Sequence, residues 1–222
     1  MRTRMLFAPL LAALAVVFAP ALAATNPAQV EGLAAVKSRT LDEVYLSPKV
    51  DFVSYRKAFV EPARVELAKG WRKSINQQRE PSRWLTAEDE RQIVDKAAAG
   101  MTEAVAKAFK DQGFEIVAAP GPGVLSVAPS TTDLFVNAPD TVTPTGQVQF
   151  THQEAGDATL NLEIRDAVSG TIVGRVVDRN TARQVGRMNR VNLLSNQFWF
   201  DAMFSAWARN CVTELAMARG AP

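Results

Sequence analysis

The fold of this chain is deduced from residues 156–178, which read GDATLNLEIRDAVSGTIVGRVVD. In the first half of this stretch, apolar and polar residues alternate strictly, which is the period of a strand with one buried face. The apolar members are Ala158, Leu160, Leu162 and Ile164. Residues 166–170 contain an aspartate that can cap its own loop, followed by a Ser-Gly pair, so they predict a turn. Residues 171–177 are rich in β-branched side chains and predict the returning strand of a hairpin.

Two amphipathic helices are predicted, one on each side of this hairpin in the sequence. The first begins at Thr86, where Thr86 and Asp89 have the spacing of a capping box, and it ends before Gly113. The second covers residues 195–217. In both helices apolar residues recur at spacings of three and four, which gives each helix a single apolar stripe. We expect both stripes, including the aromatic residues of the second, to face the core.

The other segments supply further strands and their connections. Strands are predicted within residues 41–67, 114–119 and 124–136. Pro62 implies an edge or a bend in the first of them, and Pro129 an interruption in the third, because proline has no N–H for a sheet. Residues 139–157 are polar and predict a loop, and residues 69–84 predict a long irregular connection. The sequence therefore predicts an α+β domain of order β-α-β-β-β-β-α, with one mostly antiparallel sheet covered by the two amphipathic helices.

The N-terminus has the pattern of a secretory signal peptide. Arg2 and Arg4 precede an unbroken apolar run over residues 5–18, and residues 21–23 are a small-x-small cleavage pattern. We expect cleavage after Ala23 and export to the periplasm of a Gram-negative cell. An uncleaved anchor is the alternative, which the shortness of the apolar run and a proline at its end disfavour.

At 222 residues, with 47% hydrophobic and 22% charged residues, the chain is long enough for one domain with its own core. The predicted division is a signal peptide at 1–23, an N-terminal lead at 24–40 that is a frayed helix or disordered, a single α+β domain at 41–217, and a tail at 218–222. Without Arg2 and Arg4, the mature chain has 23 basic and 23 acidic residues, so general affinity for nucleic acid is not implied.

Cys211 is the only cysteine, so an intramolecular disulfide is excluded even in an oxidising compartment. Because it lies near the C-terminus, far from the cleavage point, it is not the acylated cysteine of a lipoprotein.

The sequence lacks the residue sets of common catalytic and cofactor sites. The only histidine, His152, lies in the predicted polar loop, and one histidine with one cysteine cannot build the sites that zinc prefers. No phosphate-binding glycine loop is present, so neither a metal nor another cofactor is predicted. The alternative is a periplasmic hydrolase that uses carboxylates. The candidates are Glu61, Glu163, Asp166 and Asp178, if they converge in space.

Two basic segments form a candidate interaction surface. Arginines recur every four residues after the hairpin turn, which keeps them on one side of a strand or helix. The irregular connection adds two tryptophans without an apolar pattern around them, which we expect to be exposed. The surface would comprise Trp71, Arg72, Lys73, Arg83, Trp84, Arg175, Arg179, Arg183, Arg187 and Arg190. A solvated charged face is the alternative; if the surface binds, planar arginines suit an acidic envelope protein or another anionic envelope component.

The chain resembles the uncharacterised proteobacterial family catalogued as domain of unknown function 3313. The stretches that carry the resemblance are residues 41–45 (LDEVY), 55–62 (YRKAFVEP), 116–125 (IVAAPGPGVL), 162–174 (LEIRDAVSGTIVG) and 207–208 (WA). Many members of that family resemble outer-membrane lipoproteins, from which this chain departs by lacking the acylated cysteine. The resemblance implies no known activity, so it assigns no functional residues. Because the sequence lacks the residue sets of common catalytic sites, we expect a non-catalytic accessory or binding protein of the envelope.

Overall fold

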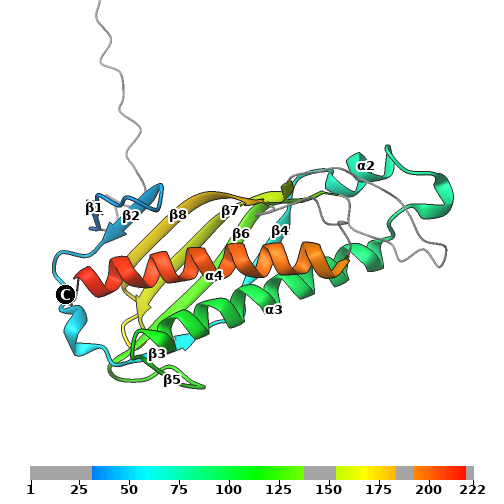
Figure 1. Ribbon diagram of the computed structural model, residues 1–222. Coiled ribbons are helices and arrows are strands. Elements are labelled where there is room, and N and C mark those ends of the chain that lie inside the picture. Colours follow the sequence, from blue (N-terminus) through cyan, green and yellow to red (C-terminus); the bar gives the residue numbers. More distant parts are fainter. Residues whose placement is uncertain (1–31, 138–153, 184–192, 219–222) are drawn as a thin grey trace, which may run out of the picture.

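The computed structural model describes residues 32–137, 154–183 and 193–218. One sheet carries two long helices, α3 (Ala87–Asp111) and α4 (Leu193–Ala218), which lie side by side over one of its faces and run in the same direction (Figure 1). The shorter elements are β1 (Ala34–Val36), β2 (Glu43–Leu46), the 3-10 helix η1 (Phe52–Ser54), β3 (Lys57–Val60), β4 (Arg64–Leu67), α2 (Trp71–Asn76), the 3-10 helix η2 (Pro81–Arg83), β5 (Glu115–Ile116), β6 (Val124–Val136), β7 (Glu154–Asp166) and β8 (Ile172–Arg183).

β7 and β8 form the predicted hairpin. They pair antiparallel, with Leu162 opposite Val176. The Oδ1 atom of Asp166 accepts the N–H of Ser169 at 2.7 Å, which closes the turn as expected. β7 begins at Glu154, slightly before the predicted start. Residues 139–153 of the predicted loop, with His152, lie outside the described residues.

The strands are ordered β1-β2-β8-β7-β6-β3-β5, and β4 pairs with β6 beyond the end of β3. The β1–β2, β2–β8, β8–β7 and β7–β6 pairs are antiparallel, whereas β3–β6, β4–β6 and β3–β5 are parallel. The α+β class and the sheet covered by two amphipathic helices are confirmed. The N-terminal region contributes more strands than predicted. Residues 34–36 of the expected lead form β1, and the segment 41–67, for which the sequence predicts one strand, contains β2, β3 and β4.

The two strand prolines behave differently. Pro62 lies in the break between β3 and β4, where the N–H of Ala63 turns to Thr102 Oγ1 of α3 at 2.9 Å, so the predicted bend is confirmed. The predicted interruption at Pro129 is wrong, since β6 runs through it. The Val127 carbonyl faces Glu61 on the β3 side, and residues two apart in a strand point their amides to the same edge. Pro129 therefore lies opposite the break between β3 and β4. No described strand pairs with this edge of β6 at that point, so the lack of an N–H on Pro129 costs no hydrogen bond of the sheet.

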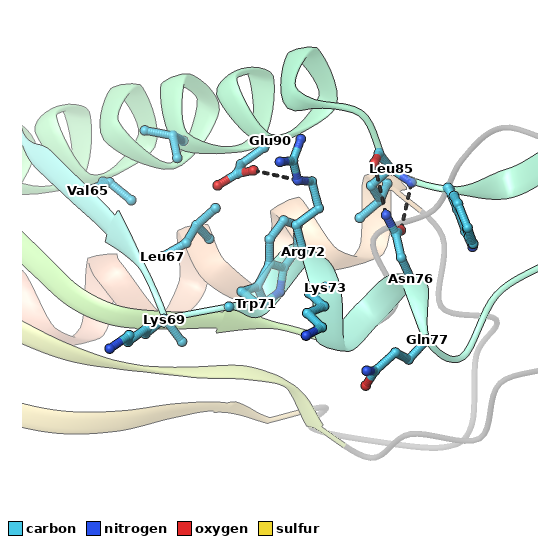
Figure 2. Close-up of a pocket in the computed structure, with 14 residues that line it drawn as sticks. Val65, Leu67, Lys69, Trp71, Arg72, Lys73, Asn76, Gln77, Leu85 and Glu90 are labelled. Atoms are coloured by element: carbon cyan, nitrogen blue, oxygen red, sulfur yellow. Dashed lines mark hydrogen bonds and ion pairs between the residues drawn. The ribbon is translucent and has the colours of Figure 1, made fainter. Parts of the chain in front are cut away.

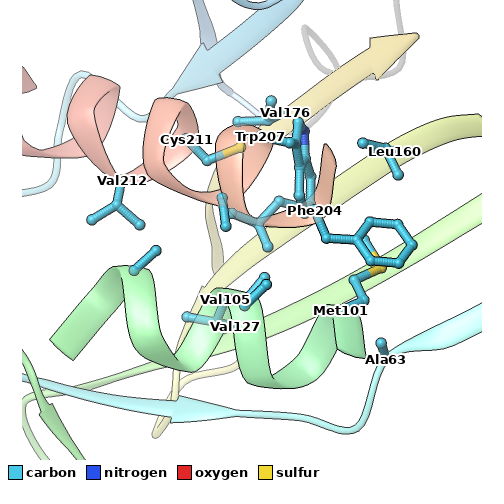
Figure 3. Packing of buried hydrophobic residues seen from close by; sticks show 14 of the residues in the cluster. Ala63, Met101, Val105, Val127, Leu160, Val176, Phe204, Trp207, Cys211 and Val212 are labelled. Carbon is cyan, nitrogen blue, oxygen red and sulfur yellow. The ribbon is translucent and has the colours of Figure 1, made fainter. Parts of the chain in front are cut away.

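The predicted helix boundaries are close to those observed. Thr86 Oγ1 accepts the N–H of Asp89 at 3.2 Å, and Asp89 Oδ2 accepts the N–H of Thr86 at 2.8 Å, which confirms the capping box before α3. α4 presents Phe204, Trp207 and Cys211 to the sheet, with α3 alongside (Figure 3). Both stripes thus form the core as expected. No helix in the described ranges combines the length and hydropathy that crossing a bilayer requires.

Candidate binding groove

An open groove of about 840 Å³ lies between the end of β4, α2 and the first turns of α3 (Figure 2). We call it the α2 groove. Its apolar part and its polar part come from the same short stretch of chain together with the start of α3. It is lined by Val65, Leu67, Ala68, Lys69, Gly70, Trp71, Arg72, Lys73, Asn76, Gln77, Trp84, Leu85, Glu90 and Val94.

One wall of the groove is α2, which is too short to be stable alone and is held by its first residue. The chain turns from β4 into this helix at Gly70, whose φ of 74° is a conformation that side chains with a Cβ rarely adopt. The Trp71 side chain is only 2% exposed, and its indole N–H donates to the Val136 carbonyl at 3.0 Å. Ile75 is buried one turn later. Packing against the end of β6 therefore fixes α2.

The opposite lip is the segment that leads into α3. Asn76 holds it by two hydrogen bonds to the main chain of Leu85, donating Nδ2 to the carbonyl at 3.0 Å and accepting the N–H on Oδ1 at 2.8 Å. Trp84 is 54% exposed, and its indole N–H donates to the Arg79 carbonyl at 3.2 Å. These hydrogen bonds fix the lip in place, while the ring of Trp84 stays in contact with solvent.

The charge of the groove is positive. Arg72 Nε lies 3.1 Å from Glu90 Oε2, and Glu90 is the one acidic residue in the lining. Lys69 and Lys73 are exposed on the rim, and neither makes an ion pair within the described residues. The groove therefore combines half-buried apolar side chains with cations at its mouth.

The structure corrects the expectation that both tryptophans of this segment are exposed. Trp71 is part of the core, because the return of the chain at α2 brings it under β6, a contact that spans 65 residues of sequence. Trp84, Arg72 and Lys73 do line the groove. Arg83 ends η2 and is exposed outside the lining. The expected irregular connection also contains α2 and η2, so it is more ordered than predicted.

The arginine row lies elsewhere. Arg175 on β8 is 2.8 Å from Glu163 Oε2 on β7, and Arg165 also pairs with Glu163. Partial burial acts to raise the pKa of Glu163, but the hydrogen bonds from these two arginines outweigh it and lower that pKa. Arg179 is exposed on the same strand. Since β7 and β6 separate β8 from β4, the structure does not bring Arg175 and Arg179 to the α2 groove.

Arg183 closes β8 without a described side chain, and Arg187 and Arg190 lie outside the described residues.

The four candidate carboxylates do not all lie on one face of the sheet. Glu163 lies on the sheet face away from the helices, whereas Asp178 is buried on the helix-covered face, where burial raises its pKa. Asp166 is held by the turn, and the N–H of Ser169 is the main reason that its pKa is lowered. Glu61 accepts a hydrogen bond from Ser126 at 2.7 Å. Because the sheet lies between them, Glu163 and Asp178 cannot act on one point as an acid and a base.

Cys211 lies on the inner face of α4. Its thiol is buried, and burial, followed by the negative charge of Asp178, raises its pKa, so it is not a thiolate at neutral pH. Within the ranges that the structure covers, no three His, Cys, Asp or Glu side chains are grouped to hold a metal ion.

Three solved structures were compared with this fold. A PelC dodecamer from Paraburkholderia phytofirmans matches with 11% identity over 75% of this chain and 94% of that chain, at a TM-score of 0.37. A DUF330 protein from Xanthomonas campestris matches with 11% identity over 74% and 85%, at 0.39. A DUF4136 family protein from Bacteroides thetaiotaomicron matches with 10% identity over 83% and 97%, at 0.37. These scores are too low to support an argument about function.

No curated protein matches the sequence. The model of the family described as "Protein of unknown function (DUF3313)" matches residues 25–211, which confirms the resemblance found in the sequence: the chain belongs to the DUF3313 family.

Proposed function

We propose that this chain is an exported, non-catalytic binding protein of the cell envelope, and that it holds an anionic partner with apolar groups in the α2 groove. The observation that carries the proposal is the groove itself, in which an apolar floor and a cationic rim lie on one concave surface. A concave, mostly apolar site with a few placed polar groups is the usual form of a binding site.

The floor supplies the driving force for binding. Val65, Leu67 and Val94 are half-buried, so each has apolar surface that a partner can remove from water. Covering the rest of such a side chain contributes about 1 kcal/mol, because roughly half of its full burial energy is already realised in the fold. Trp84 adds a rigid aromatic surface of the kind that dominates binding energies at interfaces.

The cations of the rim favour a partner with negative charge. Lys69 and Lys73 are exposed, so their attraction to an anion is screened by salt and acts mainly on the rate and selectivity of association. In the envelope, acidic proteins and anionic envelope components carry the matching charge. We expect binding to weaken as the salt concentration rises.

Export rests on residues 1–23 and is tested separately from binding. We expect N-terminal sequencing of protein from the periplasmic fraction to begin at Ala24. Recovery of a chain that begins at Met1 in the cytoplasm would contradict export.

Binding in the groove is tested by photo-crosslinking in the cells that produce the protein. A benzophenone amino acid replaces Gln77, which is exposed in the lining, or Lys49, an exposed residue between β2 and η1 at the other end of the molecule (Figure 1). We expect an adduct from position 77 and none from position 49, and we expect it to decrease several-fold with Lys69→Glu and Lys73→Glu together. Identical adducts at both positions, insensitive to the charge reversal, would contradict the proposal.

The absence of catalysis is tested with purified protein and generic ester, phosphate and glycoside substrates. Turnover that Glu163→Gln or Asp166→Asn abolishes, with an unchanged circular dichroism spectrum, would support the carboxylate hydrolase instead. We expect no turnover, because both carboxylates have lowered pKa values and are held by donors of the fold.

A further inference from the structure

We infer that the occupant of the α2 groove is an extended, acidic segment of another protein, which adds as a strand to the free edge of β4. This inference rests on the proposed function and specifies the class of the partner.

The first step is the position of β4 in the sheet. Among the described strands β4 pairs with β6 alone, whereas β3, the strand before it, has β6 on one side and β5 on the other. β4 is therefore an edge strand, and its unpaired groups are a template for another strand.

The second step is the direction of its main-chain groups. The N–H of Ala68, directly after β4, donates to the Leu134 carbonyl of β6 at 2.9 Å. Successive residues of a strand point their amides to opposite edges, so the N–H and C=O groups of Leu67 and Val65 point away from β6. The register irregularity does not disturb this alternation, because between Val65 and Leu67 the extra residue belongs to β6.

The third step is that these two residues border the groove. The side chains of Val65 and Leu67 line it, and Figure 2 shows them directed toward α3. A strand added to a sheet lies about 4.8 Å from its neighbour, which would place it at the mouth of the groove. Main-chain hydrogen bonds then supply affinity, while alternate side chains of the added strand enter the groove and supply selectivity.

The fourth step is the charge and shape of the groove. Lys69, Lys73 and Arg72 face a single acid, Glu90, so an acidic segment is complementary. A bilayer surface fits less well, because Trp84 is the only strongly exposed large apolar residue in the lining, and the others are recessed. A segment that enters the groove reaches them, whereas a flat surface does not.

The test uses the mature protein and a labelled short peptide in which glutamate alternates with valine. We expect binding to be detected by fluorescence anisotropy. We also expect amide exchange at Val65 and Leu67 to slow on binding, while the already bonded amide of Ala68 changes little. Methylating alternate amides of the peptide in one register should abolish binding, and in the other register should leave it. The matching lysine–valine peptide should not bind.

The charge dependence has a matched control. Lys69→Glu with Lys73→Glu should weaken binding about tenfold, whereas Lys49→Glu, an exposed lysine remote from the groove, should not change it. All three positions are on the surface, so the variants should fold.

The outcomes separate the inference from the proposed function. Equal sensitivity to methylation in both registers, or no protection of Val65 and Leu67, would overturn strand addition even if the crosslink at position 77 remains. Charge-dependent binding of anionic lipid vesicles without peptide binding would also overturn it and would make the partner a membrane surface. Loss of the crosslink as well would remove the proposed function itself.

Discussion

Gly156 adopts a main-chain conformation that only glycine reaches without strain. Its φ is 153°, and a Cβ placed there would lie 1.9 Å from the Phe135 carbonyl oxygen. The residue sits opposite Val136 on β6 and Ala182 on β8, so the close approach is built into the middle of the sheet. A side chain at this position can be accommodated only if β6 and β7 separate.

We therefore predict that Gly156→Ala lowers the free energy of unfolding by about 3 kcal/mol or more, through the clash and the backbone strain together. Gly121→Ala is the control, since its Cβ would have no atom within 4 Å and its φ is not positive. The measurement is the urea midpoint of the two variants. Equal midpoints would contradict the prediction.

The fold raises the pKa of the Tyr55 hydroxyl. Burial, and then the hydrogen bond from its hydroxyl to Asp166 Oδ2 at 2.8 Å, raise the pKa of Tyr55 to about 12. A raised pKa means that the native state holds the proton more tightly than the unfolded chain. The stability linked to this group is therefore complete below about pH 10 and is lost between about pH 10 and pH 12.

The chain has two tyrosines, so Tyr45→Phe leaves Tyr55 as the only phenol. We predict that its phenolate absorbance rises near pH 12, and that the additional change Asp166→Asn moves the rise toward lower pH. Circular dichroism recorded in parallel shows whether the fold is intact. A rise near pH 10 in the native protein would contradict both the burial of the Tyr55 phenol and its contact with Asp166.

Among the elements, α3 depends on the reciprocal hydrogen bonds between Thr86 and Asp89. We predict that Thr86→Ala lowers the free energy of unfolding by about 1 kcal/mol, because a helix N–H loses its acceptor. Thr86→Ser keeps the hydroxyl and should retain most of the stability.

The same contact predicts a pH dependence. The main-chain and then the side-chain hydrogen bonds of Thr86 lower the pKa of Asp89, so the linked stability is present above about pH 4 and is lost as the pH falls through the native pKa. Chemical unfolding of wild type and Thr86→Ala at neutral and acidic pH should therefore show a smaller difference in acid. A difference that does not change with pH would mean that the Thr86 hydroxyl, which donates to Asp89 Oδ2 at 2.7 Å, does not help to lower the pKa of Asp89.

For the whole molecule, Cys211 reports on the packing of the helix layer on the sheet. It is the only cysteine, it is 2% exposed, and burial raises the pKa of its thiol. Reaction with a thiol reagent requires that α4 separate from the sheet or that the domain unfold. We predict modification at least about a thousandfold slower in native buffer than in urea, since domains of this size are stabilised by at least about 5 kcal/mol.

The control places an accessible cysteine in the same fold. In Cys211→Ser with Val168→Cys, the new thiol lies on the hairpin turn at a position where the native side chain is 67% exposed. It should react promptly in native buffer. Equally fast modification of Cys211 in the wild-type protein would mean that α4 is not held against the sheet.

The sequence by itself determined the hairpin, its turn, both long helices and the capping box of α3, because each depends on residues within a few positions of one another. Asp166 accepts the N–H of Ser169, three residues later, and Thr86 accepts the N–H of Asp89 within the first turn of α3. Local periodicity also identified the buried faces correctly. The resemblance to the family was also found in the sequence, and the family model matches residues 25–211.

Only the tertiary structure decided which strands lie side by side and where the groove forms. The parallel pairing of β4 with β6 joins residues far apart in the sequence, and it explains both the continuity of β6 through Pro129 and the free edge of β4. The burial of Trp71 likewise depends on the Val136 carbonyl, 65 residues away. The pairing of Arg175 with Glu163 across β7 and β8, and the groove that Arg72, Lys73 and Trp84 line between α2 and α3, also depend on residues from different elements of the chain. Contacts of this kind depend on how the elements pack, which no local pattern of residues specifies.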